Sequence, residues 1–384
     1  MLNFTYYNPT KIVFGKGSIA QLPDLLPPEA RVLMTYGGGS IKRNGVYEQV
    51  TAALSGRTVS EFGGIEPNPE HDTLVRAIAQ ARAERSDLLL AVGGGSVLDG
   101  TKFIAAALKY EGDDPWTIMT DRIDVAEAAP IGCVLTLPAT GSEMNGNFVV
   151  SRRSMGQKLG GWSAAVHPQF SILDPESTYS LPPRQTANGA VDAFIHVTEQ
   201  YLTYDVNAPL QARQAEAVLL TLIEEAPKAL ANPRDYDARA NLMWCATNAL
   251  NSLVGRGVPG DWASHMIGHE LTALYGIDHG QSLAVVWPCV ARHQRDAKHD
   301  RLLQYAERVW GLAEGDADAR IDAALERTVE FFRSLGVGTT LSDYDIPAEA
   351  GRLVAERLAS RGMILGEHKA IGPKEVQDIL ALAQ

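Results

Sequence analysis

The sequence has few cysteines, and their spacing offers no pairing. Cys133, Cys245 and Cys289 are odd in number, far apart and set among apolar neighbours, and no Cys-x-x-Cys pair occurs. This excludes a disulfide scaffold and a metal site of paired thiolates, because both need closely spaced cysteines. We therefore expect three buried, reduced thiols in a cytoplasmic protein.

The sequence also lacks a long apolar run, a signal-peptide pattern and an excess of basic residues. No apolar stretch approaches the roughly 18 residues of a membrane span. The N-terminus, MLNFTYYNPTKIVFG, has no basic region followed by an apolar one. The 34 lysines and arginines face 46 aspartates and glutamates, which gives a net charge of −12. Because phosphate backbones are bound by clustered positive charge, we expect no nucleic acid as partner. Because no apolar run is long enough to span a membrane, we expect no membrane either.

What is present is a chain with two differently patterned halves. At 384 residues it exceeds the roughly 250–300 residues at which a single core stops growing. Residues 1–180 alternate short β-rich runs with helical stretches, which predicts βαβ units and a mostly parallel sheet. The expected strands are Lys11–Phe14, Arg31–Tyr36, Thr58–Phe62, Asp87–Val92, Cys133–Pro138 and Phe170–Leu173, and the expected helices include Gly45–Leu54, His71–Glu84 and Val97–Lys109.

From about Leu181 only helical spacing remains. The change falls in a proline-containing stretch, from Asp174-Pro175 to Leu181-Pro182-Pro183, that is unfavourable for helices. We therefore expect an α/β domain at residues 1–180 and an all-helical domain at residues 181–384. The expected helices are Arg184–Leu202, Pro209–Ala231, Ala238–Leu253, Trp262–Leu274, Ser282–Arg292, Leu302–Trp310 and Ile321–Leu335, followed by helical structure around a loop at Ile364–Pro373.

Two expected strands end in the same glycine-rich turn. One leads into Gly37-Gly38-Gly39-Ser40, the other into Gly93-Gly94-Gly95-Ser96, after which Val97 is expected to open a helix with Asp99 in its first turn. Glycines allow positive φ and a close approach of ligand to backbone, and the N–H groups of a helix start favour phosphate. Neither turn is a Gly-x-Gly-x-x-Gly fingerprint. The alternative, tight turns that merely need glycine, stays open.

A third candidate loop follows the strand at Cys133–Pro138. It has the sequence Pro138-Ala139-Thr140-Gly141-Ser142-Glu143. Its hydroxyl groups and glycine suit contacts to a polar ligand, although an ordinary loop has the same composition. Ser142 is not a candidate nucleophile, because Thr-Gly-Ser-Glu does not fit Gly-x-Ser-x-Gly.

The strongest chemical pattern lies in the second half. Asp192 and His196 are four residues apart, so both side chains leave one face of a helix within reach of one ion. His265, His269 and His279 then fall within fifteen residues. A carboxylate with imidazoles and no thiolate suits divalent iron, zinc, cobalt, nickel or manganese.

The alternative is that these histidines are hydrogen-bonded core residues. A single histidine in an apolar helix is commonly of this kind, but such a cluster is not. His265 and His269 share a helix face, so spacing alone leaves open which of them is a ligand. Glu270 follows the second histidine instead of the first, so the segment is not the His-Glu-x-x-His motif of metalloproteases.

At these residues the sequence resembles the iron-containing alcohol dehydrogenase family, and within it the NADPH-dependent aldehyde reductases and butanol dehydrogenases. The resemblance covers the whole chain. It implies a dehydroquinate synthase-like architecture, with a Rossmann-like dinucleotide-binding domain, a helical metal-binding domain and, we expect, a homodimer. The motifs that carry it are Phe14-Gly-Lys-Gly, Gly93-Gly-Gly-Ser-Val-Leu-Asp99, Pro138-Ala-Thr-Gly-Ser-Glu143, Asp174-Pro175, Asp192-x-x-x-His196, His265-x-x-x-His269 and His279-Gly280.

The resemblance also implies site residues and cofactors. It implies NADP(H) and one divalent ion, Fe²⁺ or Zn²⁺, and leaves His269 beside the ion as a catalytic, proton-handling residue. The implied metal ligands are Asp192, His196, His265 and His279. The implied cofactor contacts are Gly93, Gly94, Gly95, Ser96 and Asp99 near the pyrophosphate, and Thr136, Thr140 and Ser142 near the adenine or nicotinamide ends.

Two departures from the family pattern concern the cofactor. The NAD-using branches carry an aspartate after the first strand, where this chain has Gly37-Gly38-Gly39-Ser40, followed by Lys42 and Arg43. Without that anion a 2′-phosphate is not repelled, and the amides, Ser40 and the two cations can attract it. We therefore expect NADPH to be preferred, although Lys42 and Arg43 also fit a solvated surface pair. The second departure is Met144-Asn-Gly-Asn147, on the nicotinamide side.

The expected reaction is reduction of an aldehyde to a primary alcohol by hydride transfer from NADPH. The metal polarises the carbonyl oxygen. The nicotinamide supplies the hydride, and a water, with His269 as proton relay, returns the proton to the oxygen. Trp262, Met266, Leu271 and Tyr275, near the histidines in sequence, favour a small apolar aldehyde. One alternative is a metal- and NAD-dependent synthase or lyase, which needs basic residues for an anionic sugar. The other is a non-catalytic dinucleotide- or metal-sensing module, which would turn over no aldehyde.

Overall fold

The computed structural model describes residues 1–384 and divides into two compact units. The α/β unit comprises Tyr7–Leu181 and Pro233–Thr247. The helical unit comprises Met1–Tyr6, Pro182–Asn232 and Asn248–Gln384. Each unit is therefore assembled from segments that are separated along the chain.

A six-stranded, all-parallel sheet forms the centre of the α/β unit. Its strands are β1 (Lys11–Phe14), β2 (Arg31–Tyr36), β3 (Thr58–Phe62), β4 (Leu88–Gly94), β5 (Ile131–Leu137) and β8 (Phe170–Leu173). Their order is β1-β8-β5-β4-β2-β3. β4 and β5 are apolar runs buried on both faces, as expected for parallel strands under helices. Because β2, β4 and β5 are neighbours, the loops that follow them leave one edge of the sheet together.

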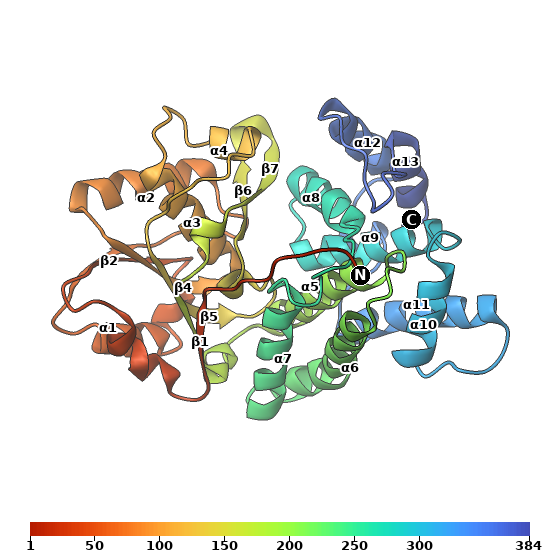
Figure 1. Cartoon of the computed structure of the whole chain (residues 1–384), viewed down its shortest axis with the longest axis horizontal. Helices are drawn as coiled ribbons and strands as arrows, with labels where there is room; N and C mark the ends of the chain where they lie inside the picture. Colours follow the sequence, from red (N-terminus) through yellow and green to blue (C-terminus); the bar gives the residue numbers. More distant parts are fainter. The chain divides into compact units, whose positions relative to one another are not determined.

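Helices cover both faces of this sheet (Figure 1). α1 (Val46–Ala53) and a 3-10 segment, Ser18–Leu25, lie on one face, and α2 (His71–Glu84) and α3 (Gly95–Lys109) lie on the other. Side chains along β4 alternate between the two cores, as strand geometry requires: Leu88 joins the first core and Leu89 the second. This confirms the predicted α/β layering.

The structure adds a β-hairpin that the sequence did not predict. β6 (Asn147–Arg152) pairs with β7 (Gln157–Trp162) in an antiparallel two-stranded sheet beside the short helix α4 (Thr117–Thr120). The strand signal is weak because β7 contains Gly160 and Gly161, and glycine disfavours strands. β6 packs against α3 through buried side chains such as Phe148.

The second glycine-rich turn also differs from the prediction. β4 extends to Gly94 and α3 begins at Gly95 instead of Val97, so Asp99 lies in the second turn of the helix and not in the first. None of the three glycines there has a positive φ. A Cβ on Gly93 would lie 2.6 Å from Val97, so glycine at this turn makes room for the helix to start directly at the strand end.

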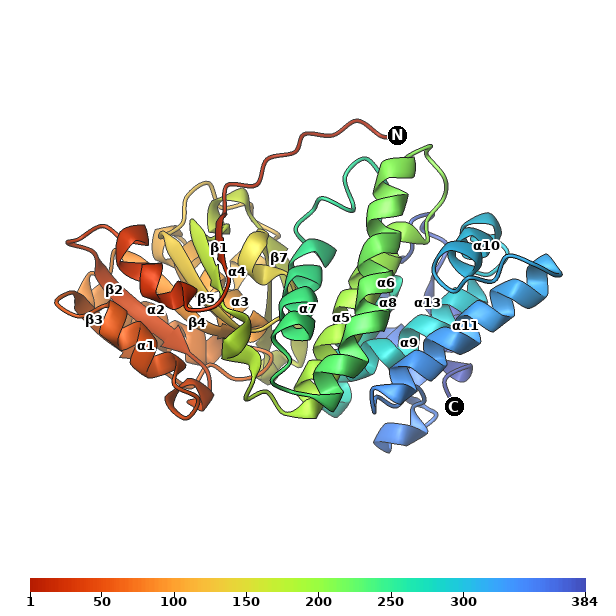
Figure 2. The ribbon, with the colours of Figure 1, turned by 90° about the horizontal axis from the view of Figure 1, so that it is seen from below.

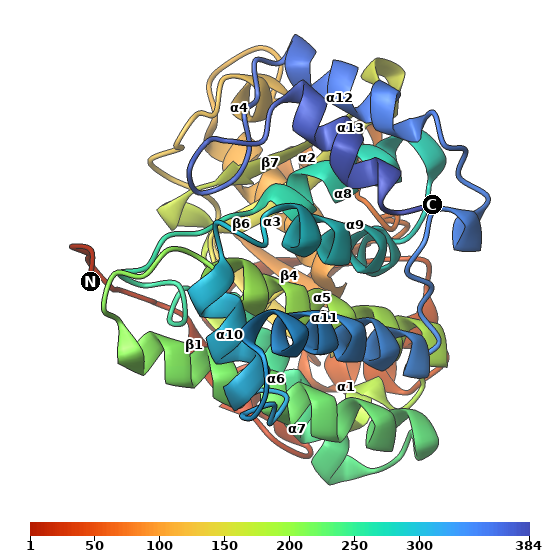
Figure 3. The same cartoon turned by 90° about the vertical axis from the view of Figure 1, so that its right-hand side faces the viewer.

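The central helix of the helical unit is α5 (Pro183–Tyr201), which is buried along nearly its whole length. α5 runs beside α6 (Pro209–Ala231) (Figure 2) and also packs on α9 (His279–His293). Most of α7 (Tyr236–Ala249) belongs to the α/β unit. None of the helices combines the length and apolar composition that crossing a membrane requires. The other helices are α8 (Ala263–Tyr275), α10 (His299–Arg308), α11 (Ala317–Ser334), α12 (Ala350–Ser360) and α13 (Pro373–Ala381), of which α12 and α13 pack together (Figure 3).

Candidate metal centre and dinucleotide site

Three helices of the helical unit bring the predicted metal-ligating residues together. Asp192 and His196 lie on α5, His265 lies in the first turn of α8, and His279 is the first residue of α9. α9 packs against both α5 and α8, so the three helices converge. Asp192, His196 and His265 are buried, whereas His279 is partly exposed and leaves one side of the group accessible.

Asp192 Oδ1 is the central donor atom of this group. It lies 3.5 Å from Nδ1 of His196, 3.7 Å from Nε2 of His265 and 3.8 Å from Nε2 of His279. One donor atom each from Asp192, His265 and His279 all lie within 4.8 Å of one another. These separations are too long for good hydrogen bonds but approach the ~3.4 Å between ligand atoms around a tetrahedral ion with bonds of ~2.1 Å.

His196 and His269 flank the three-donor group. The His196 ring stacks on that of His265, with ring centroids 4.5 Å apart. His269 lies one helical turn after His265, and its ring centroid is 4.9 Å from that of His279 and 6.3 Å from that of His265. The structure thus places all five predicted residues in one cluster. That four of them bind the ion while His269 does not remains a prediction.

The position of His279 is determined by the local structure at the start of α9. Asp278 forms a capping box with Gln281, whose side chain accepts from the Asp278 N–H at 3.1 Å. Asn188 of α5 donates to Asp278 at 2.8 Å. Gly280 is needed because a Cβ there would lie 2.5 Å from the Asn188 carbonyl oxygen. The first turn of α9 is therefore held directly against α5.

Sequence analysis missed Glu199, which is bonded to His265. Its carboxylate contacts Nδ1 of His265 and accepts from the Ser264 N–H at 2.6 Å. Burial lowers the pKa of His265, but the charges of Glu199 and Asp192 raise it more, to about 9. A signal was present in the sequence, because Glu199 follows Asp192 by seven residues and His196 by three, which puts all three on one face of α5.

This donor set fits a divalent ion. Asp192 Oδ1 and His265 Nε2 are buried and have no hydrogen-bond partner. Leaving buried polar atoms unsatisfied costs free energy unless a bound group satisfies them. A carboxylate oxygen with imidazole nitrogens is a donor set suited to Fe²⁺ or Zn²⁺.

The apolar residues expected near the histidines are mostly core residues. Leu271 is fully buried in a cluster with α12 and α13, and Met266 and Tyr275 pack against the same cluster. Only Trp262 lies beside the metal-ligating group, with its ring centroid 5.4 Å from that of His265. Sequence proximity was misleading because Met266, Leu271 and Tyr275 occupy other faces of α8. Trp262 alone therefore supports an apolar substrate.

In the α/β unit, the predicted dinucleotide residues lie at the carboxyl ends of three neighbouring strands. Gly37–Ser40 follow β2, Gly93–Ser96 span the end of β4 and the start of α3, and Thr136, Thr140 and Ser142 lie at the end of β5 and in its loop. This is the edge at which parallel α/β sheets bind ligands. The structure therefore brings these residues to the edge that a dinucleotide would use.

Glycines bring the β5 loop into contact with the start of α3. A Cβ on Gly94 would lie 2.8 Å from Leu137, and one on Gly95 would lie 2.5 Å from Thr140 Oγ1. In the first glycine-rich turn, only Gly39 has a positive φ, +83°. The two turns thus need glycine for different reasons, close packing in one and backbone conformation in the other.

Asp99 and Ser142 are bonded within the protein. Asp99 accepts from Ser142 Oγ at 2.7 Å and from the Val149 N–H at 3.0 Å. Lys102, which sequence analysis missed, is fully buried and donates to Ser142 Oγ and to the Asn145 carbonyl, both at 2.8 Å. Burial raises the pKa of Asp99 and lowers that of Lys102 to about 8. The network fixes the loop between β5 and β6, and a direct role of Asp99 at a pyrophosphate remains a prediction.

Lys42, one of the two cations predicted near the 2′-phosphate, already has an anionic partner. Its Nζ lies 3.1 Å from Glu61 and over the rings of Tyr36 and Tyr47, at 4.8 and 4.6 Å from their centroids. Both tyrosine hydroxyls donate to Glu61. Sequence analysis missed Glu61 because it lies on β3, remote from the turn in sequence. Arg43, the second cation, is exposed.

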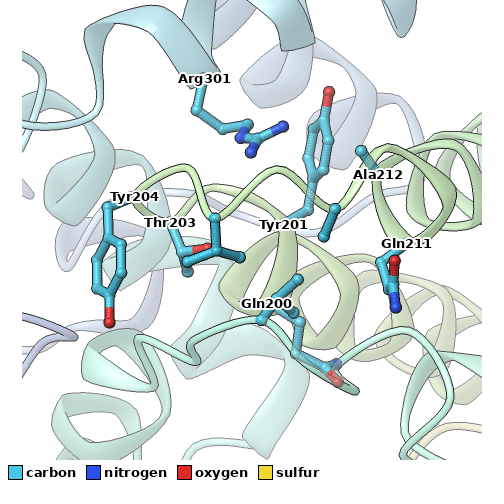
Figure 4. A pocket seen from close by; sticks show the side chains of 10 residues that line it. Gln200, Tyr201, Thr203, Tyr204, Gln211, Ala212 and Arg301 are labelled. Carbon is cyan, nitrogen blue, oxygen red and sulfur yellow. The ribbon is translucent and has the colours of Figure 1, made fainter. Parts of the chain in front are cut away.

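The helical unit also contains a small cavity of mixed polarity at the C-terminal end of α5 (Figure 4). The side chains of Gln200, Thr203, Gln211 and Arg301 line it. Its volume of about 10 Å³ has room for roughly one water molecule. It is too small for an aldehyde or a nicotinamide and is therefore not a substrate site.

The chain is similar to known families and proteins over nearly its whole length. Residues 9–175 match the family described as iron-containing alcohol dehydrogenase, and residues 186–384 match the C-terminal part of the Fe-containing alcohol dehydrogenase family. The chain is 56% identical to the NADPH-dependent aldehyde reductase YqhD of Escherichia coli strain K12, with 97% of each protein covered. It is 42% identical to the probable NADH-dependent butanol dehydrogenase 1 of Bacillus subtilis strain 168, with 99% of each covered.

Solved structures give the same result. The crystal structure of YqhD from E. coli K-12 matches with a TM-score of 0.98 at 54% identity, covering 100% of this chain and 99% of that one. The NADH-dependent butanol dehydrogenase A of Thermotoga maritima matches with a TM-score of 0.96 at 37% identity, covering 100% and 99%. These matches confirm the predicted architecture, a parallel α/β unit with a helical second unit.

Proposed function

The chain belongs to the iron-containing alcohol dehydrogenase family, and from this premise we propose that it reduces aldehydes to primary alcohols, and catalyses the reverse reaction, with NADP(H) as hydride carrier. The observation that carries the proposal is the group formed by Asp192 Oδ1 and the ring nitrogens of His196, His265 and His279. The 56% identity to an NADPH-dependent aldehyde reductase supports the same reaction.

Asp192, His196, His265 and His279 would hold the divalent ion, Fe²⁺ or Zn²⁺. When bound, such an ion supplies Lewis-acid polarisation of the substrate carbonyl oxygen. Asp192 contributes the anionic oxygen, and its burial keeps water from competing for it. The three histidines contribute neutral nitrogens, and the partial exposure of His279 leaves a side open for substrate.

His269 is proposed to handle the proton. Aldehyde reduction adds a hydride to the carbonyl carbon and a proton to its oxygen, and NADPH supplies only the hydride. His269 is buried beside the metal-ligating group, so a ring nitrogen can hold a proton and pass it on through a water. This role suits histidine because its ordinary pKa lies near neutrality.

The α/β unit is proposed to bind NADPH at the edge described above. The N–H groups at the start of α3 favour the pyrophosphate. The amides of Gly37–Ser40 and the Ser40 hydroxyl favour the 2′-phosphate. Because Lys42 is shared with Glu61, we expect Ser40, the amides and Arg43 to supply more of the attraction than Lys42.

Enzyme assays with metal analysis of the same sample test this function. We expect NADPH oxidation with short aldehydes and one divalent ion per chain. His265→Ala should lose the ion and nearly all activity while staying folded. His269→Ala should keep the ion, lose roughly 10²- to 10⁴-fold in rate and show an altered pH profile. His293→Ala, at the far end of α9, is the control and should resemble the wild type.

Three outcomes would contradict parts of the proposal. A metal-loaded protein that turns over no aldehyde would reject the dehydrogenase function. Full metal occupancy in His265→Ala would reject the ligand assignment. Loss of the ion from His269→Ala would make His269 a ligand and overturn its role in proton transfer.

We further propose that the protein is a homodimer of the cytoplasm. The N-terminal segment of the helical unit exposes apolar side chains, Leu2 at 45% and Phe4 at 49%, which is typical of contact surfaces. All three cysteines are buried and unpaired, as suits a reducing compartment. Sedimentation velocity tests the dimer, and cell fractionation tests the compartment.

A further inference from the structure

We propose that Glu199 is a positioning residue of the metal centre, which holds His265 in the orientation and tautomer that direct its Nε2 toward Asp192 and His279. The proposal rests on the proposed function only in treating this group as a metal centre. It concerns a side chain that donates nothing to the ion and acts through another residue.

The first observation is that both carboxylate oxygens of Glu199 are used by one short segment. Oε2 contacts Nδ1 of His265, and Oε1 accepts from the Ser264 N–H at 2.6 Å. Glu199 is only 4% exposed, so bulk water does not compete for either contact. The carboxylate therefore holds the ring of His265 and the backbone next to it at the same time.

The second observation is the state in which this leaves the ring. In the neutral ring that a metal ligand requires, a carboxylate at Nδ1 keeps the proton on that nitrogen, so the lone pair is on Nε2. Nε2 is the atom that lies 3.7 Å from Asp192 Oδ1, and it has no hydrogen-bond partner of its own. Glu199 thus turns Nε2 of His265 toward Asp192 and selects the tautomer that leaves this nitrogen free to bind an ion.

The third observation is that the start of α8 is held to α5 at the same place. The Asp261 N–H donates to the main-chain oxygen of Glu199 at 2.9 Å, and the Asp261 side chain accepts from the Ala263 N–H at 2.9 Å. With the bond from Ser264 to Glu199, two carboxylates satisfy two of the free N–H groups of the first helical turn. The backbone that carries His265 is therefore fixed from both sides.

The surroundings of Glu199 direct its charge to His265. Glu199 lines a cavity of about 20 Å³, to which Trp287 and Val290 also contribute. Lys298 also lines this cavity, but its ammonium group is ion-paired with Asp261 and Glu367. The direct partners of the Glu199 carboxylate are therefore His265 and the adjacent N–H.

Glu199→Gln tests the proposal because it keeps the shape and removes one acceptor. If the amide oxygen accepts from Ser264, the amide NH₂ faces His265 Nδ1, which must then accept and carry its proton on Nε2. If the amide is turned round, the NH₂ group opposes the Ser264 N–H. Either arrangement disturbs the nitrogen that faces the ion.

We expect Glu199→Gln to bind Zn²⁺ and Co²⁺ about 10- to 100-fold more weakly in competition with a chelator. The visible absorption spectrum of the Co²⁺ form should also change, because the spectrum reports ligand geometry. The control is Glu216→Gln on α6, another buried carboxylate, which accepts from Tyr201 and Gln304 and lies outside the histidine cluster. It should lower stability without changing Co²⁺ affinity or spectrum.

Glu199→Asp is the second variant, because it keeps the charge but withdraws the carboxylate by one methylene group. Its metal affinity should lie between those of the wild type and Glu199→Gln. Wild-type affinity and spectrum in either folded Glu199 variant would overturn the positioning role while leaving the proposed function intact. Failure of the wild type to bind Zn²⁺ or Co²⁺ would overturn both.

Discussion

In the turn proposed to bind the 2′-phosphate, Gly37–Ser40, Gly38 is the glycine that can take a side chain with the least structural disturbance. A Cβ added there meets no atom within 4 Å, and its φ is not positive. The neighbouring Gly39, by contrast, has a φ of +83° and would be strained by any side chain. A substitution at Gly38 therefore reports on charge and not on backbone strain.

Gly38→Asp should weaken the use of NADPH far more than that of NADH. The new carboxylate would repel a 2′-phosphate and compete for the amides that are proposed to bind it. Charge-assisted contacts of this kind are worth about 1.5–3 kcal/mol, so the ratio of kcat/KM values should shift by roughly ten- to a hundredfold. Gly38→Ala, which adds a side chain without charge, is the control. An unchanged ratio in Gly38→Asp, or a wild type that uses NADH equally well, would reject the assignment of Gly37–Ser40.

Single residues could be predicted from the sequence where their signal is local. The pair Asp192 and His196 was found because a four-residue spacing on a helix requires one face. Lys102 was not found, since a lysine on a helix usually lies on the surface and only the folded chain shows the acceptors that bury it. Glu61 is likewise recognised only when β3 lies next to β2.

Helix α7 shows that an element can belong with parts of the chain far from it in sequence. Its residues up to Thr247 are in the α/β unit although helical-unit segments flank them on both sides. Trp244 packs on Phe14 with ring centroids 6.0 Å apart, and Thr247 donates to the buried carboxylate of Glu143.

Thr247→Val should destabilise the protein by about 1–3 kcal/mol, because it leaves the Glu143 carboxyl group buried without its donor. Burial already raises the pKa of Glu143, so no ordinary solvent contact compensates for the loss. Denaturant unfolding measures the effect. Thr221→Val is the matched control, since Thr221 bonds only the Ala217 carbonyl of its own helix near the surface. An equal effect of the two substitutions would show that the contact to Glu143 contributes nothing.

At the scale of elements, periodicity predicted every strand of the parallel sheet to within a few residues. It failed for the β6–β7 hairpin, where glycines weaken the strand pattern and the strands are stabilised by packing on α3. It could not show where α7 packs, because the apolar face of a helix does not identify its partner. Propensity is a local property, whereas the choice of partner is a property of the whole fold.

At the scale of the whole molecule, Lys298 connects distant parts of the helical unit. Its ammonium group donates to the Leu202 carbonyl after α5, to Asp261 before α8 and to Glu367 near the C-terminus. Two carboxylates thus share one buried cation. Burial, with the neighbouring Asp261, raises the pKa of Glu367 from 4.5 to about 7.

A carboxyl group whose pKa is raised by folding stabilises the fold more in its protonated form than in its ionised form. The extra stability of the protonated form is complete below pH 4.5 and is lost as the pH rises through about 7. Glu367→Gln, which imitates the protonated acid, should therefore become more stable relative to the wild type across this range. Unfolding free energies at several pH values check this. Glu314→Gln, at an exposed position, should show no such trend. A constant difference between the wild type and Glu367→Gln would contradict the prediction.

The interleaving of the two units has a consequence for how the protein is made. A ribosome completes Tyr7–Leu181 before it has translated Pro233–Thr247, so the newly made sheet is without α7 while residues 182–232 emerge. Glu143 lacks its threonine during this interval. Conversely, the first residues of the chain cannot pack in the helical unit until Gly257 has been made, because the Leu2 N–H donates to the Gly257 carbonyl. Each unit therefore includes a segment made after part of the other unit. We expect nascent chains stopped before Thr247 to depend most on chaperones.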